Sequence, residues 1–290
     1  SIWLFVFFGA LSAAAQEDRI TTATDSICRH YFERYRQVGM SVGIVHGGKA
    51  YHFAAGATDH SGRFPVTDST LFHLASVTKL FTATAILQLA EAGKLRLDDA
   101  LTKHIPEFSM RDERYRDIQL QHLLTHSSGL MWDNKLKNSS DDAGSMPLFI
   151  SQLKKKKLAF RPGEKMSYST YSNVGFDLLG MVVERVSGQS YDQYIPSRIW
   201  APAGMTGAAF YYETVEKALL ALPQKLEGRS KKVRILNRGL HYDSLAFSGS
   251  WPFPTITHPV YGEEYEHNAS GNAIASAAEL RLWMRHLLDI

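Results

Sequence analysis

The stretch ASVTKLFTATAILQLAEAGKL, residues 75–95, carries the helical pattern on which the interpretation of the chain depends. Apolar residues recur in it at the spacing of one helix face, at Leu80, Ala83, Ile86, Leu87 and Ala90. Gly93 follows where glycine favours the end of a helix. We therefore predict a helix over residues 76–92, whose first turn holds Ser76.

Ser76 and Lys79 are three residues apart, so on this helix they lie on one face, a turn from each other. A serine hydroxyl is a weak nucleophile until a neighbouring group takes its proton, and a lysine shielded from water can serve as that group. Backbone N–H groups at a helix N-terminus also favour negative charge beside the serine. The pattern predicts Ser76 as a nucleophile with Lys79 as its base.

Two other serines compete for this role. Ser151 and Lys154 repeat the S-x-x-K spacing, but Lys154 opens a run of lysines, an exposed context in which it stays charged and cannot act as a base. Ser41 lies in GMSVG, residues 39–43, which matches the G-x-S-x-G elbow of α/β-hydrolases. That elbow needs a strand before the serine and a helix after it, and this sequence predicts the reverse order. We expect Ser41 to be a strand residue.

Residues 160–188, FRPGEKMSYSTYSNVGFDLLGMVVERVSG, place Tyr171, Ser172 and Asn173 just before a predicted helix. A tyrosine held near a lysine can pass protons, and a neighbouring side-chain amide can bond a substrate. The same residues are compatible with a surface tyrosine and an asparagine that caps the helix. Taken alone, the stretch leaves both interpretations open.

The remaining pattern predicts a small β-region interrupted by a long helical insertion. Residues 24–38 have a helical pattern that Gly39 could cap, and residues 40–56 read as two strands around Gly47-Gly48. Further helices are predicted over residues 117–126, 144–158, 173–187 and 276–289.

Composition is that of a globular protein, with 44% hydrophobic and 21% charged residues. Residues 1–15 combine an apolar run, too short to cross a bilayer, with Ala13-Ala14-Ala15, which fits a signal-peptidase site. This predicts a cleaved signal peptide and a periplasmic or secreted protein, without a membrane span after cleavage.

The single cysteine, Cys28, excludes an intrachain disulfide and a thiolate zinc site. The sequence contains no H-E-x-x-H motif, and no metal is expected. The formal charge of +3 is small for this length and gives no reason to expect nucleic acid as a partner.

Four stretches together resemble the serine β-lactamase and penicillin-binding protein superfamily, and within it the class C β-lactamases with related D,D-carboxypeptidases and esterases. They occur in the family's order: LASVTKLFTATAILQL at 74–89, LLTHSSGL at 123–130, FRPGEKMSYSTYSNVGFDLLG at 160–180, and NASGNAIASAAELRLWMRHLL at 268–288. The resemblance implies a mixed α/β (α+β) fold of the β-lactamase/transpeptidase type, in which an antiparallel sheet flanked by helices adjoins an all-α domain across the active-site cleft. We expect the α/β part over about residues 16–75 and 255–290, and the helical part over about 76–254.

The resemblance also implies roles for the site residues. Ser76 would be acylated, Lys79 and Tyr171 would handle protons, and Asn173 would bind the substrate on its carbonyl side, without a cofactor. Tyr168 is a weaker candidate for the place of Tyr171, because no asparagine follows it two residues later. His122 and His126, near the end of a predicted helix, are given a structural role.

The family's third motif, a Lys or His followed by a small residue and Gly, does not follow residues 270–272. His46-Gly47-Gly48 has a similar spelling, but it precedes Ser76 and reads as a hairpin turn. The chain is therefore expected to be C-terminally truncated, without its last sheet strands. Low activity is expected of it alone, because one oxyanion-hole donor would be absent.

The expected function is that of an exported serine hydrolase acting through an acyl-enzyme at Ser76. A D-Ala-D-Ala-type peptide, a β-lactam or a small ester would all present a carbonyl to the same residues, so the substrate class stays open. The alternative is a non-catalytic, penicillin-recognising binding or sensor module of the same fold.

Overall fold

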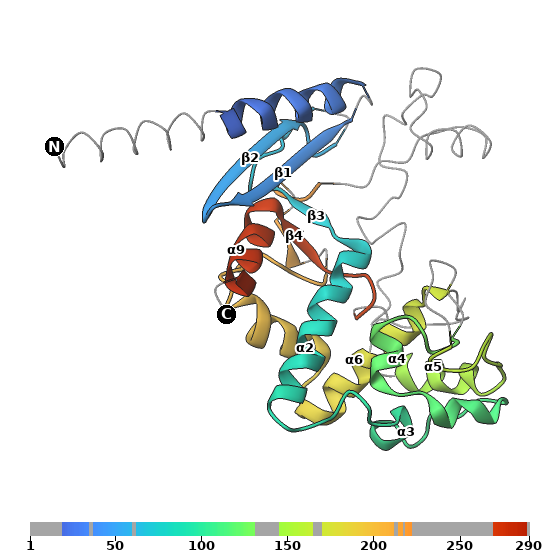
Figure 1. The fold of residues 1–290 in the computed structure, drawn as a ribbon. Helices are drawn as coiled ribbons and strands as arrows, with labels where there is room; N and C mark the ends of the chain where they lie inside the picture. Colours follow the sequence, from blue (N-terminus) through green and yellow to red (C-terminus); the bar gives the residue numbers. More distant parts are fainter. Residues whose placement is uncertain are drawn as a thin grey trace, which may run out of the picture. The chain divides into compact units, whose positions relative to one another are not determined.

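The computed structural model describes residues 19–34, 37–59, 62–130, 145–164, 170–211, 214–216, 218–221 and 269–288 (Figure 1). The chain divides into two compact units: residues 1–72, 215–256 and 275–290 form the first, and residues 73–214 and 257–274 form the second. The predicted signal peptide and Tyr168 lie outside the described residues. So do residues 222–268, and the predicted domain boundaries therefore stay a prediction.

The first unit is built on an antiparallel hairpin of β1 (Gly39–His46) and β2 (Lys49–Gly56), in which His46 pairs with Lys49 and Gly39 with Gly56. Gly47 and Gly48 form the turn with φ values of +56° and +75°. A two-residue turn with positive φ at both positions matches the twist of the strands, and glycine adopts it without steric cost. The predicted hairpin and its turn are confirmed.

Helices cover both faces of this hairpin (Figure 1). Val42 and Phe53 are directly opposite, so they face the same side, and the guanidinium of Arg29 in the helix of residues 19–34 lies 5.8 Å from the Phe53 ring. Gly43 faces the other side, where a side chain would meet Arg281 of α9 (Ala277–Leu288): a Cβ on Gly43 would lie 2.8 Å from Arg281 Cγ. The missing side chain therefore lets α9 approach the sheet.

An ion pair fixes α9 in this position. Arg281 donates two hydrogen bonds to Asp68, at 2.8 and 2.5 Å, and the Asp68 carbonyl accepts from Ala278 N at 3.3 Å. Two short strands, β3 (Leu71–His73) and β4 (Ile274–Ser276), form a second two-stranded sheet at the residues where the chain passes between the units.

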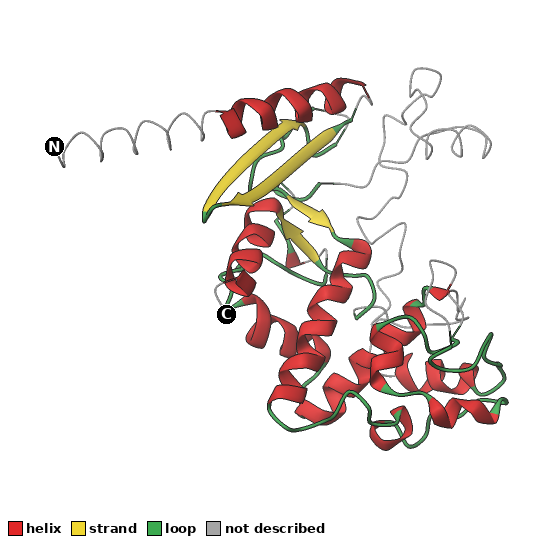
Figure 2. Cartoon of the chain, viewed as in Figure 1, coloured by secondary structure: helices red, strands yellow, loops and turns green. Residues whose placement is uncertain are grey.

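The second unit is dominated by helices (Figure 2). Its helices are η1 (Ala75–Thr78), α2 (Lys79–Glu91), α3 (Leu101–His104), η2 (Glu113–Asp117), α4 (Leu120–Leu124), α5 (Ser145–Leu153), α6 (Asn173–Ser187), α7 (Tyr191–Ile195) and η4 (Pro196–Trp200). Every residue of α6 from Val174 to Val183 is buried, and α2 packs against it. On α2, the buried Phe81 ring meets the Trp200 ring edge-to-face at 5.7 Å. These two helices form the core that supports the site.

The first two expected helices differ in detail from the structure, and a later one matches it. The first helix covers residues 19–34 instead of 24–38, and Gly39 does not cap it but begins β1, where a Cβ would lie 2.3 Å from the Ala57 carbonyl oxygen. The helix predicted over 76–92 begins as the 3₁₀ turn η1 and continues as α2. Helix α6 has the predicted bounds, and Gly188 ends it with φ of +73°.

Candidate active site

Ser76 lies on the exposed side of η1, directly after a residue with an unusual backbone conformation. Ala75 has φ of +46°, in the left-handed region that an L-residue with a Cβ occupies at a cost of about 1–2 kcal/mol. Its N–H donates to His73 Nδ1 at 3.3 Å, and Leu74 N donates to the carbonyl of Ala273 at 2.8 Å. These two bonds fix the backbone directly before Ser76, whose side chain is exposed.

Lys79 lies beneath Ser76, with only 6% of its surface exposed. Its Nζ donates to Ser76 Oγ at 3.3 Å, to Asn173 Oδ1 at 2.8 Å and to the carbonyl of Ser270 at 2.5 Å. An ammonium has three hydrogens to donate, and all three have acceptors here. The lysine is therefore held as a saturated donor.

Tyr171 reaches the same serine from the segment before α6. Its Oη donates to Ser76 Oγ at 2.5 Å, and Lys79 Nζ lies 5.0 Å from its ring centroid. A second ring, Phe176, lies 5.5 Å from the same ammonium. Both distances are within the range of cation–π attraction, so both rings can attract the ammonium group.

Asn173 is the first residue of α6, not its N-cap. The cap is Ser172, whose side chain accepts from Gly175 N at 3.1 Å. The interpretation of Asn173 as a helix cap is therefore wrong, and its side chain faces Lys79 instead. The structure thus brings together the four residues that the sequence singled out: Ser76, Lys79, Tyr171 and Asn173.

The sequence did not assign a role to the backbone of residues 269–273, which lies along η1 and α2. The carbonyl of Ala269 accepts from Thr82 Oγ1 at 2.6 Å, the carbonyl of Ser270 accepts from Lys79, and Ala273 N donates to Thr78 Oγ1 at 3.0 Å. In the sequence this segment was marked only by Ser270-Gly271-Asn272, within the stretch quoted at 268–288. A contact made by a backbone carbonyl leaves no trace in the residue type, so the sequence could not predict it. This segment supplies one of the three acceptors of Lys79.

His126 lies against the Tyr171 ring, with the two ring centroids 4.4 Å apart. Burial, and secondarily the charge of Lys79, lowers the pKa of His126 to about 4, and burial also lowers the pKa of His122. His122 Nδ1 accepts from Gln119 N at 3.2 Å at the start of α4, as its predicted structural role requires.

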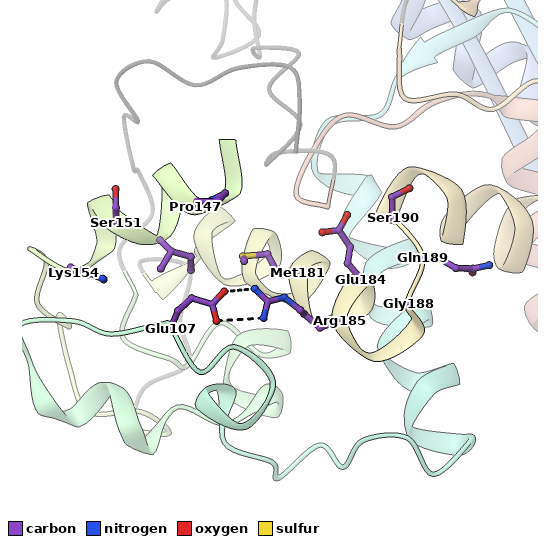
Figure 3. A pocket seen from close by; sticks show the side chains of 11 residues that line it. Glu107, Pro147, Ser151, Lys154, Met181, Glu184, Arg185, Gly188, Gln189 and Ser190 are labelled. Carbon is purple, nitrogen blue, oxygen red and sulfur yellow. Dashed lines mark hydrogen bonds and ion pairs between the residues drawn. The ribbon is translucent and has the colours of Figure 1, made fainter. Parts of the chain in front are cut away.

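The rival serines are not placed for catalysis. Ser151 donates to the carbonyl of Leu148 in its own helix at 2.7 Å, and both Ser151 and Lys154 are exposed. Figure 3 shows them at the edge of a pocket of about 790 Å³, next to the Glu107–Arg185 ion pair. Ser41 lies within β1, followed by strand and not by helix, so the elbow interpretation is excluded.

Within the described part of the chain, no group of three or more His, Cys, Asp or Glu residues could hold a metal ion. In the same residues, no helix combines the length and the apolar character needed to span a membrane.

The family model described as Beta-lactamase matches residues 24–290. Protein flp of Staphylococcus aureus (strain COL) is 31% identical over 212 residues, which cover 72% of this chain and 42% of that protein. Esterase EstB of Burkholderia gladioli is 34% identical over 242 residues, covering 78% of this chain and 59% of the esterase. This chain thus spans about half the length of these curated relatives.

Solved structures agree with this assignment. An octameric penicillin-binding protein homologue from Pyrococcus abyssi matches with a TM-score of 0.68 and 26% identity, over 91% of this chain and 55% of that one. A class C beta-lactamase matches with a TM-score of 0.72 and 22% identity, over 93% and 65% of the two chains, which shows the shared fold. The predicted β-lactamase/transpeptidase-like fold is confirmed.

Proposed function

The chain belongs to the beta-lactamase family of serine hydrolases, and from this premise we propose that it hydrolyses an amide or ester carbonyl through an acyl-enzyme at Ser76. One observation carries the proposal: the exposed Ser76 Oγ is bonded by Lys79 Nζ at 3.3 Å and by Tyr171 Oη at 2.5 Å. A hydroxyl held between a cation and a proton-transfer group has the surroundings that a serine nucleophile needs.

Tyr171 is the direct proton acceptor in this proposal, and Lys79 acts through its charge. We treat Lys79 as the ammonium, which finds an acceptor for each of its three hydrogens and has no lone pair for the serine proton. In this proposal Tyr171 acts as the phenolate, so the proton that it donates to Ser76 Oγ in the structure leaves before the step. As Ser76 Oγ bonds to the substrate carbonyl carbon, its proton passes to Tyr171 Oη.

The proton then passes from Tyr171 to the leaving alcohol or amine as its bond to the carbonyl carbon breaks. Water releases the acyl group by the reverse sequence: Tyr171 takes a proton from the water, and Ser76 regains one as the acid departs. Asn173 accepts from Lys79 through Oδ1, so its amide N–H group is the part that can donate to a substrate.

For the substrate we propose a small ester, a β-lactam or a D-Ala-D-Ala-type peptide. The relative named as an esterase supports the ester, and the class C beta-lactamase and penicillin-binding neighbours share the fold. A hydrophobic or polar lining of the substrate pocket would discriminate among these, because each presents a different group beside the same carbonyl.

We also propose that the protein is exported, with residues 1–15 as its signal peptide. The full natural protein recovered from a cell envelope or culture medium would then begin at Gln16. An N-terminal sequence that retains the apolar run would contradict export by this route.

The test of the catalytic proposal is intact-protein mass spectrometry of the full natural protein and its Ser76→Ala variant. Each is exposed briefly to a fluorophosphonate and, separately, to a penicillin. We expect one covalent adduct on the wild type and none on Ser76→Ala, with Ser151→Ala as a matched control that keeps the adduct, because Ser151 is bonded to its own helix.

A persistent penicillin adduct would indicate a penicillin-binding peptidase, and rapid loss of it would indicate a β-lactamase. A folded wild-type protein that forms no adduct with either reagent would contradict the hydrolase and favour a non-catalytic binding module of the same fold.

A further inference from the structure

His126 is held in a backbone conformation that most residues avoid. Its φ is +56°, and among the described residues Ala75, next to the serine, is the other non-glycine residue with positive φ. This conformation costs about 1–2 kcal/mol and concentrates at functional sites, although histidine tolerates it better than most residues. Both strained positions of the described chain therefore adjoin the proposed catalytic residues.

The loop that carries His126 is fixed from both sides. His126 N donates to the carbonyl of Leu123 at 3.2 Å, and Ser127 N donates to the carbonyl of His122 at 2.8 Å, so the loop is bonded to α4. Gly163 N donates in turn to the carbonyl of Ser127 at 2.8 Å. The imidazole is therefore presented from a rigid turn.

The ring makes two contacts with the segment that carries Tyr171. Its Nδ1 accepts from Ser172 N at 3.1 Å, and its face lies against the Tyr171 ring with the planes tilted by 33°. Phe176 is a second aromatic neighbour of the imidazole, with the two ring centroids 5.1 Å apart. The imidazole thus holds both the backbone after Tyr171 and the ring itself.

Ser172 connects His126 to helix α6. Its N–H bonds His126, while its side chain caps α6 by accepting from Gly175 N. Ser172, which directly follows Tyr171, is therefore fixed through both its backbone N–H and its side-chain hydroxyl. The direction of the tyrosine side chain follows from that anchor.

We propose that His126 is a positioning residue, which as a neutral imidazole holds Tyr171 Oη over Ser76 Oγ by accepting the Ser172 N–H and packing on the tyrosine ring. The inference rests on the proposed function, because it gives Tyr171 its role in proton transfer. It assigns His126 a task beyond completing the end of α4.

The neutral form is required because a protonated Nδ1 would be a donor and could not accept the Ser172 N–H. The titratable groups that the described residues place against the ring are Tyr171, before α6, and Lys79, on α2. Burial and the Lys79 charge hold the pKa of His126 at about 4, so the imidazole is neutral at pH 5 to 8. The lysine that serves the site therefore also protects the acceptor state of the histidine.

The experiment measures the rate at which a fluorophosphonate labels Ser76 in a double-mutant cycle. The full natural protein is compared with His126→Gly, Tyr171→Phe and the double variant, and glycine is used because it adopts φ of +56° freely. We expect His126→Gly to slow labelling on the order of 10²-fold, the usual consequence of a small misplacement of a reacting group. In the Tyr171→Phe background, His126→Gly should slow labelling by no more than about twofold, which is the deviation expected of sites that do not interact.

A conservative variant separates positioning from folding. His126→Asn tolerates the left-handed backbone and retains an acceptor near the place of Nδ1, so it should recover part of the rate and lose the acid decline of the wild type near pH 4. Equal losses from His126→Gly with and without Tyr171 would overturn the proposal. The proposal would also be overturned if His126→Asn were labelled no faster than His126→Gly although both variants have the melting temperature of the wild type.

The position of Tyr171 is also read without any reaction, by ¹⁹F NMR of protein containing 3-fluorotyrosine. The Tyr171 signal is the one lost in Tyr171→Phe, and we expect it to shift in His126→Gly and to return toward the wild-type position in His126→Asn. If the signal shifts in this way but no reagent labels the wild-type protein, the positioning role is supported and the proposed function is contradicted. An unmoved Tyr171 signal in His126→Gly would overturn the positioning whatever the labelling.

Discussion

Thr82 shows at the scale of one residue how the helix under the serine is joined to the segment that bonds Lys79. Its buried hydroxyl donates to the carbonyl of Ala269 at 2.6 Å and bonds Tyr191 Oη at 2.7 Å. Burial is also the main reason why the pKa of Tyr191 is raised far above its ordinary value, so the phenol stays neutral and needs this partner.

We expect Thr82→Val to lower the free energy of unfolding by about 1–3 kcal/mol, because it leaves two buried polar groups unpaired without changing side-chain shape. Thr84→Val is the matched control. Thr84 Oγ1 bonds the exposed carbonyl of Leu80 in its own helix, and its loss should change stability by no more than about 0.5 kcal/mol. Urea unfolding of both variants measures the difference, and equal midpoints would contradict the role of the buried hydroxyl.

At this scale the sequence predicted what helical spacing dictates and missed what remote contacts create. The interval between Ser76 and Lys79 placed their polar atoms 3.3 Å apart, as expected for one turn. Ser151 and Lys154 have the same interval but differ in burial, which the neighbouring lysines already indicated. The Ser270 carbonyl and the stacking of His126 on Tyr171 could not be foreseen, because neither follows from periodicity.

Among the elements, α6 depends on a glycine that propensity alone would replace. Gly180 lies in its buried middle, and a Cβ there would be 2.5 Å from the Cβ of Ala269. Alanine would gain about 1 kcal/mol of helix propensity, but the clash should cost about 1–3 kcal/mol of overpacking. The clash also pushes on the segment whose next residue, Ser270, bonds Lys79.

We therefore expect Gly180→Ala to lower both the melting temperature and the rate of Ser76 labelling. In an Ala269→Gly background, which removes the opposing methyl, the same change should no longer destabilise and should follow the helix propensity instead. A Gly180→Ala protein that is more stable than the wild type in both backgrounds would show that the segment of residues 269–273 yields without cost.

Element type was better predicted than element boundaries. The bounds of α6 were correct because Ser172 and Gly188 supply a cap at each end. Helix α4 is Leu120–Leu124 where residues 117–126 were predicted, since Glu113–Asp117 forms the separate turn η2 and His126 turns out of the helix. Gly39 was misjudged as a cap because its real constraint, the close approach of Ala57 and Val66, comes from chain that is distant in sequence.

At the scale of the whole molecule, acid should destabilise the fold in two separate pH windows. In the upper window the pKa of His126 is about 4 in the folded protein, mainly through burial, against an ordinary 6.5. Between these values the unfolded chain binds a proton that the folded chain excludes, so stability falls as pH falls from 6.5 to 4. His122, whose pKa burial also lowers, acts in the same direction.

In the lower window the groups are carboxylates. The hydrogen bond from the Arg114 side chain holds the pKa of Asp112 at about 2, below its ordinary 3.8. A depressed carboxyl pKa contributes stability that is complete above pH 4 and is lost as pH falls toward 2. The two windows adjoin, so the fold should lose stability continuously from neutral pH to pH 2.

Urea unfolding midpoints at pH 7, 5.5, 4 and 3 measure this dependence. The wild type should lose between about 1 and 3 kcal/mol from the upper window, since one pKa unit corresponds to about 1.4 kcal/mol and the His126 ring is partly exposed. His126→Asn should flatten the decline between pH 6.5 and 4 and leave the lower window intact, whereas Asp112→Asn should do the reverse. A wild-type midpoint that is constant from pH 7 to pH 4 would contradict the exclusion of the proton from His126, and with it the neutral acceptor on which the position of Tyr171 depends.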